Sequence, residues 1–109
     1  MENKSFNTEE VYKMNGAIDY QDGGIVSKQV IKNSAGNISL FAFDKGQGLS
    51  EHTAPFDAVV QVIDGMAEVI IGGKSHQVHE GEMIIMPANV PHALNAPEPF
   101  KMCLVMLKG

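Results

Sequence analysis

The fold is decided by two stretches of this sequence, GQGLSEHTAPFDAVVQVIDG at residues 46–65 and GEMIIMPANVPHALNA at residues 81–96. Each stretch contains short apolar runs with glycine or proline at its turns. Each also holds one histidine, His52 in the first and His92 in the second. Short apolar runs that are bounded by Gly, Pro, Asn or Asp are typical of β-strands. Both stretches therefore predict β-structure.

The same pattern extends outward from these stretches in both directions. We expect strands at residues 25–32, 37–44, 57–63, 66–71, 74–79, 82–86, 92–95 and 100–108. Small and polar residues at 33–36, Asp64-Gly65 and Gly72-Gly73 favour tight hairpin turns, so the joined strands should be antiparallel. Many short strands with such turns are typical of an all-β sandwich or barrel.

The N-terminal segment differs from the rest of the chain. Asn7 and Thr8 offer a capping side chain, and Glu9 and Glu10 follow as acids in a first turn, so we expect one short helix that ends near Met14. A chain of 109 residues has room for one core. The predicted organisation is an arm with this helix at residues 1–24 and a barrel at residues 25–109.

Composition and charge narrow the classes of partner. Apolar residues make up 44% and charged residues 19% of the chain, as in ordinary globular proteins. The net charge is -5 with no basic run, which argues against nucleic acid and anionic membranes as partners. The start of the chain lacks a signal-peptide pattern, and Cys103 is the single cysteine, so we expect a cytoplasmic protein without an internal disulfide.

The first stretch resembles the first motif of the cupin family. That motif carries His, His and Glu or Gln at the positions held here by His52, Ala54 and Ala58, with glycines at the ends, here Gly46 and Gly65. The resemblance implies a cupin double-stranded β-helix, which is a jelly-roll barrel, over about residues 25–108.

The second stretch is similar to the second cupin motif, whose Gly, Pro, Gly, His and Asn fall on Gly81, Pro87, Asn89, His92 and Ala96. Asn89 replaces a glycine, and Asn is the residue after Gly that best tolerates the left-handed backbone conformation. We therefore expect the turn to be preserved.

The resemblance also implies a divalent metal ion, because cupins usually hold iron, manganese, nickel, copper or zinc on three histidines and a carboxylate. Only His52 and His92 carry over, since Ala54 and Ala58 have no donor atom. The metal site is degenerate, and the expected cofactor is either none or a divalent metal ion. Weak candidates for a third ligand are Asp57, Glu51, Gln47 and His76, although strand alternation turns Asp57 away from the face of Ala58.

Two functions from different classes follow. The first is binding of a small molecule in the barrel, in a pocket lined by His52, His92, Ala54, Ala58, Val60 and Met86. The alternative is a divalent-metal-dependent dioxygenase, isomerase or lyase that completes its metal site with another donor. A regulatory or structural dimer is a third interpretation, and whether the protein is an enzyme stays open.

Several predicted strands are apolar on consecutive residues, notably 58–60 and 83–86. Such strands are covered on both faces. Since the chain has few residues left to serve as a second cover, we expect a homodimer.

Overall fold

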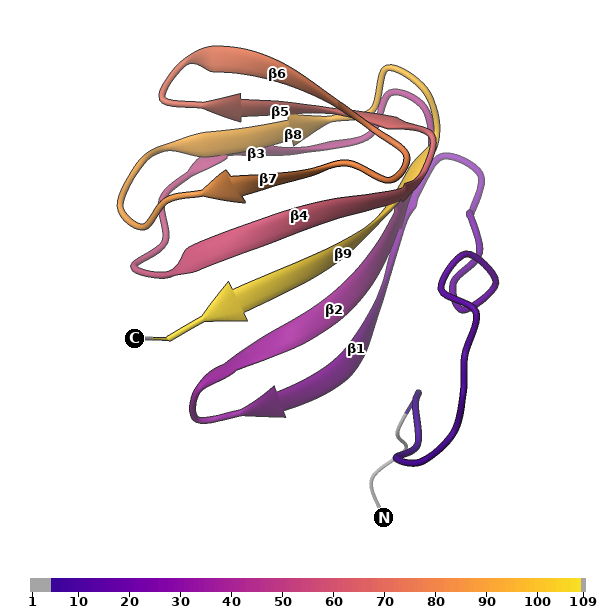
Figure 1. Ribbon diagram of the computed structural model, residues 1–109. Helices are drawn as coiled ribbons and strands as arrows, with labels where there is room; N and C mark the ends of the chain where they lie inside the picture. Colours follow the sequence, from indigo (N-terminus) through magenta and orange to yellow (C-terminus); the bar gives the residue numbers. More distant parts are fainter. Residues whose placement is uncertain (1–4, 109) are drawn as a thin grey trace.

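Two antiparallel β-sheets face each other across an apolar core in the computed structural model, which describes residues 5–108 (Figure 1). The strands are β1 (Ile25–Asn33), β2 (Gly36–Phe43), β3 (Gly48–His52), β4 (Asp57–Asp64), β5 (Met66–Ile71), β6 (Lys74–His79), β7 (Met83–Met86), β8 (His92–Asn95) and β9 (Phe100–Leu107). The larger sheet has the order β1-β2-β9-β4-β7, and the smaller sheet has the order β3-β8-β5-β6. The all-β prediction is confirmed.

The core lies between the sheets because apolar residues alternate along the strands and point inward from both. Phe43 on β2 and Phe100 on β9 are direct cross-strand partners, and their stacked rings have centroids 4.5 Å apart. An aromatic pair of this kind contributes about 0.5–1.5 kcal/mol beyond the area it buries. Val60 on β4 and Val69 on β5 are also fully buried, one from each sheet.

The outer face of the larger sheet carries a second apolar cluster, which includes Leu40 on β2 and Cys103 on β9. Part of the chain's own N-terminal arm covers it, and Ile18 of the arm is fully buried there. Figure 1 shows this arm running beside the sheet, outside the barrel. The sequence predicted a second subunit as the cover, whereas the arm already supplies part of it.

Two lysines of the larger sheet hold the arm in place. Lys28 Nζ on β1 donates to the backbone oxygen of Ala17 at 3.1 Å, and Lys101 Nζ on β9 donates to the backbone oxygen of Asn15 at 2.6 Å. In a helix these carbonyls would accept from backbone amides. In this turn the two ammonium groups supply the hydrogen bonds instead.

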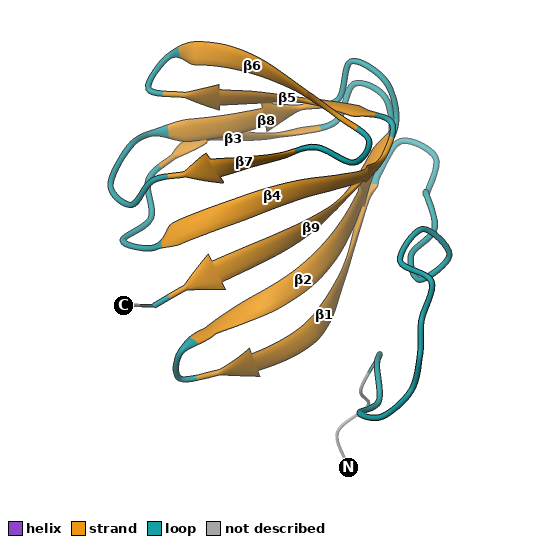
Figure 2. Cartoon of the chain, in the orientation of Figure 1, coloured by secondary structure: helices purple, strands orange, loops and turns teal. Residues whose placement is uncertain are grey.

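The predicted helix is wrong: no helix occurs between residues 5 and 108 (Figure 2). Glu9 has a φ of 62°, which ends any right-handed turn at that residue. The amide of Asn7 donates to Tyr12 Oη at 3.0 Å, and its side chain donates to Glu10 at 3.4 Å. A helix this short is costly to nucleate, and these local contacts offer the backbone an alternative. Residues 5–108 accordingly contain no helix that is long and apolar enough to cross a membrane.

Three predicted strands match their observed bounds, and five differ by one residue at one or both ends. Sequence analysis missed β3 (Gly48–His52), which places His52. Its residues GLSEH are mostly exposed and only Leu49 packs against the core, so the apolar signal of a strand is weak there.

Candidate functional site

His52 and His92 face each other as direct cross-strand partners on β3 and β8. Their ring centroids lie 4.4 Å apart, with the ring planes at 68°. A register shift on β3 between Leu49 and His52 makes this possible, because three steps along β3 oppose two steps along β8. Strand alternation alone would turn Leu49 and His52 to opposite faces. The β-bulge brings both to the face that carries the buried Leu94.

The two histidines differ in their access to solvent. His92 is 6% exposed and lies beside Ile71 of β5, its partner on the other side. His52 is exposed, on the edge strand of the smaller sheet. The pair therefore joins a buried imidazole to an exposed one.

Both imidazole rings are oriented in the same way. His52 Nδ1 lies 2.8 Å from the backbone oxygen of Ser50, and His92 Nδ1 lies 3.2 Å from that of Val90. A carbonyl oxygen only accepts, so each Nδ1 must carry the hydrogen, and in the neutral ring Nε2 is left with its lone pair. Within residues 5–108 neither Nε2 has a hydrogen-bond partner.

Sequence analysis missed the role of Ser50 and Val90, whose carbonyls orient the rings. Each lies two residues before its histidine, and because the contact uses a backbone oxygen, the side chains of Ser50 and Val90 gave no signal for it. The tautomer matters because it decides which ring atom is free to bind another group.

Asp57, one of the four weak candidates for a third ligand, makes a different contact. Asp57 Oδ1 accepts a hydrogen bond from the amide of Ala88 at 2.9 Å, and the residue is exposed on β4 opposite Leu107. This contact ties the loop before β4 to the loop after β7. Asp57 therefore supports the loops around the histidine pair.

His76 faces inward as expected, since its cross-strand partner is the buried Val69. It lies on β6, however, two strands away from β8. At about 4.8 Å per strand the backbones of the two residues are about 10 Å apart, and within residues 5–108 His76 belongs to no group of three or more side chains suited to a metal ion.

Glu51 is exposed on β3, and Gln47 lies just before this strand, where its backbone oxygen accepts from the amide of Ala96 at 2.9 Å. No group of three or more His, Cys, Asp or Glu side chains suited to a metal ion occurs within residues 5–108. Two imidazoles fall short of the three or four protein ligands that are normal for such ions. The donors that the structure describes do not complete a metal site.

The alanines at the two altered ligand positions have structural roles. The backbone oxygen of Ala54 accepts from the amide of Asn89 at 2.8 Å, which joins the two motif loops. Asn89 has a φ of 64°, so the left-handed turn predicted for it is confirmed. Ala58 lies between Met86 of β7 and Met106 of β9 as cross-strand neighbours.

Ala58, Val60 and Met86 are all at least 95% buried in the core cluster. They lie on the inner face of the larger sheet, whereas the histidine pair belongs to the smaller sheet. The structure thus places a polar pair at one edge of an apolar interior, the arrangement expected of a small-molecule site.

Comparison with known proteins agrees with this architecture. The family model for the cupin domain matches residues 39–107. A conserved protein of unknown function from Streptococcus pyogenes is 33% identical with a TM-score of 0.92, over 97% of this chain and 93% of that one. Among curated proteins, none matches this sequence.

Two further solved structures are similar to this chain to different degrees. A cupin 2 conserved barrel domain protein from Leptotrichia buccalis is 39% identical with a TM-score of 0.87, over 89% of this chain and 47% of that one. Salicylate 1,2-dioxygenase from Pseudoaminobacter salicylatoxidans is 18% identical with a TM-score of 0.71, over 76% of this chain and 25% of that one. At this identity the likeness to the dioxygenase concerns the fold alone.

Proposed function

Because this chain belongs to the cupin family, we propose that it binds a small molecule through the imidazoles of His52 and His92. The observation that carries the proposal is the matched geometry of the two rings. Each has its Nδ1 on a backbone carbonyl, and the centroids lie 4.4 Å apart. The two Nε2 atoms are therefore fixed by the backbone before any ligand arrives.

The chemistry of this pair favours a ligand with a polar head and an apolar remainder. Two neutral imidazoles offer two acceptors for hydroxyl or N–H groups, and protonated imidazoles offer two donors for a carboxylate. Ile71 and Leu94, beside His92, would contact the apolar part. Such a ligand combines a few fixed polar contacts with apolar burial, as small-molecule sites do.

The test is a thermal-shift screen of small organic acids, alcohols and sugars, followed by calorimetry on the molecules that stabilise the protein. His92→Ala and His52→Ala should each weaken binding, about tenfold for the loss of one hydrogen bond to a polar ligand. His79→Ala is the matched control, because His79 is 60% exposed and pairs with Glu82 in a distant turn. Ligands that bind both histidine variants as tightly as the unchanged protein would refute the proposal.

A divalent-metal-dependent enzyme, of the dioxygenase, isomerase or lyase type, is the second candidate. It is favoured by the Nδ1 contacts, since metal-binding histidines commonly donate their other ring N–H to a carbonyl or carboxylate. Such an enzyme would need further donors from water or substrate. Elemental analysis after incubation with iron, manganese, nickel, copper or zinc decides between the candidates. Near-stoichiometric metal that disappears in the His52→Ala, His92→Ala double variant would favour the enzyme.

We also propose that two copies associate through the part of the larger sheet that the arm leaves open. Val105, Val59 and Ile85 form a cross-strand row on this outer face, and Ile85 and Met83 are 59% and 64% exposed. An aliphatic patch of this kind is self-complementary across a two-fold axis. Light scattering should give twice the chain mass, and Ile85→Lys should give the single mass.

The cytoplasmic location expected from the sequence stays a prediction. It is supported by the single cysteine, because disulfide-bonded folds dominate in oxidising compartments. Cell fractionation with an antibody against the protein would test it.

A further inference from the structure

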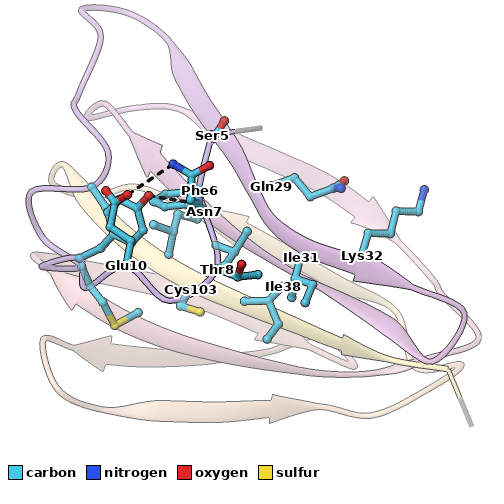
Figure 3. A pocket seen from close by; sticks show the side chains of 15 residues that line it. Ser5, Phe6, Asn7, Thr8, Glu10, Gln29, Ile31, Lys32, Ile38 and Cys103 are labelled. Atoms are coloured by element: carbon cyan, nitrogen blue, oxygen red, sulfur yellow. Dashed lines mark hydrogen bonds between the residues drawn. The ribbon is translucent and has the colours of Figure 1, made fainter. Parts of the chain in front are cut away.

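We propose that the cavity beneath the N-terminal arm is a second binding site, separate from the histidine pair, and that it takes an amphipathic carboxylate. By this we mean a molecule with an apolar body and one carboxylate group. The cavity has a volume of about 760 Å³ and lies on the outer face of the larger sheet (Figure 3). Small-molecule sites have volumes of about 300–1,000 Å³.

The floor of this cavity is apolar. It is made by Ile38 and Leu40 of β2, Val30 of β1 and Cys103 of β9. Leu40 and Cys103 are 3% and 5% exposed, so they belong to the packed outer cluster. The floor is therefore formed by three neighbouring strands of the larger sheet.

The roof is made by the arm, which keeps its own shape over the floor. The rings of Phe6 and Tyr12 meet edge to face with centroids 4.9 Å apart, and the Asn7 amide donates to Tyr12 Oη at 3.0 Å. The following turn is anchored to the sheet by Lys28 and Lys101. The roof is thus held by its internal contacts and by this anchor, which leaves the volume beneath it for another molecule.

The two ends of the cavity differ in charge. Figure 3 shows Lys32 at one end and Glu10 at the other, with Ile38 and Cys103 between them. Glu10 accepts a hydrogen bond from the side chain of Asn7 at 3.4 Å, whereas no ion pair involves Lys32 within residues 5–108. A carboxylate would therefore lie at the Lys32 end, and its apolar body would cover Ile38 and Cys103.

The site has a built-in reporter, because Cys103 is the only cysteine of the chain and lies in the floor. Decanoate is the probe, and decanol, which has the same chain without the charge, is its matched partner. At a decanoate concentration of about ten times its Kd, alkylation of Cys103 by iodoacetamide should slow about tenfold. Unchanged alkylation at saturating decanoate would overturn the proposal.

The charge is tested with Lys32→Gln, which should weaken decanoate binding about three- to fivefold and leave decanol binding unchanged. The control is Lys45→Gln, an exposed lysine in the connection between β2 and β3. Equal effects of both substitutions on decanoate would overturn the role of Lys32. Because Lys32 and Lys45 are both exposed, neither change should impair folding.

Three further measurements distinguish decanoate binding beneath the arm from binding at the histidine pair and from occupation of the cavity by protein. The His52→Ala, His92→Ala double variant should still bind decanoate, and loss of binding there would assign decanoate to the histidine pair. A chain shortened by residues 1–4 should bind equally well, and binding only after shortening would make the chain's own start the occupant. Protection of Cys103 that grows with protein concentration, without decanoate, would assign this surface to a second copy.

Discussion

Replacing Lys101 by Met should release the N-terminal arm from the sheet while the barrel stays folded. Lys101 is 7% exposed, and its Nζ donates to the backbone oxygen of Asn15 at 2.6 Å and to the side-chain oxygen of Asn15 at 3.0 Å. The same ammonium lies 5.0 Å from the ring centroid of Tyr20, whose hydroxyl donates to Asp64 at 2.5 Å. Partial burial, and then this hydrogen bond, raise the pKa of Tyr20, so its hydroxyl stays a donor.

The expected loss of free energy of arm docking follows from these contacts. A hydrogen bond from a charged donor contributes about 1.5–3 kcal/mol, and a cation over an aromatic ring adds about 0.5–1 kcal/mol. Methionine keeps the packing of the aliphatic stem, and the oxygens of the exposed Asn15 regain water. The net loss should be about 2–3 kcal/mol of arm docking, so the undocked state should become about 30- to 150-fold more populated.

The assay is the rate at which iodoacetamide alkylates Cys103, which the docked arm helps to bury. When the arm opens and closes faster than the reagent reacts, the rate follows the population of the open state. Lys101→Met should therefore raise the rate by about the same factor, up to the rate of a free thiol. Far-UV circular dichroism should keep its β-sheet signal.

The effect of the lost charge is separated from the release of the arm by its sign and by one control variant. Losing a nearby cation disfavours the thiolate and so slows alkylation, which is opposite in sign to the expected change. Lys45→Met removes the same charge from an exposed connection and should leave the rate unchanged. An unaltered rate in a folded Lys101→Met protein would show that this lysine does not hold the arm.

Three other outcomes are expected. Gly65→Ala should lower the free energy of unfolding in urea titrations by about 2 kcal/mol or more, because φ is +74° and the added Cβ would lie 2.0 Å from a backbone oxygen. The control is Gly73→Ala, where φ is +81° but the added Cβ would meet no atom within 4 Å, so the free energy of unfolding should fall less. Hydrogen bonds from the backbone and then the ring of His79 hold the pKa of Glu82 below 4.5. The ionised Glu82 therefore stabilises the folded protein above pH 4.5, and this stabilisation is lost as the pH falls through the lowered pKa. Glu82→Gln should therefore flatten the decline of the urea midpoint below pH 4.5. Burial raises the pKa of Cys103 above 9.0, so its alkylation rate should rise between pH 9 and pH 10 by more than the roughly 1.8-fold of a thiol with an unshifted pKa, and a smaller rise would contradict this.

Most strands were predictable because local chemistry specifies them. Hairpins at Gly65 and Gly72 need glycine at positive φ, with values of 74° and 58°, and the apolar runs beside them have the length of strands. The strand β3 was not predictable from its own residues, since pairing with β8 holds it in place. The helix expected after Asn7 failed for a related reason: contacts with Tyr12 decided the arm's conformation.

In the candidate site, too, part of the arrangement was predictable from the sequence and part was not. Motif spacing identified His52 and His92. Strand parity predicted that Asp57 points away from the interior, and in the structure its carboxylate accepts a hydrogen bond from the Ala88 amide. Parity alone gave no reason for His52 and Leu49 to share a face. The β-bulge between them is a property of the pairing with β8, because a register exists only when two strands are present.

The sequence by itself determined the all-β class, the turns, the family and the two histidines, because each depends on residues close together in the chain. Only the tertiary structure decided what these residues meet. It brought the ring centroids of the two histidines to 4.4 Å, set each Nδ1 on a carbonyl, and folded the arm over Leu40 and Cys103 with a cavity beneath it. These contacts join residues up to 86 positions apart, as Lys101 and Asn15 are, and no local pattern specifies such a pair.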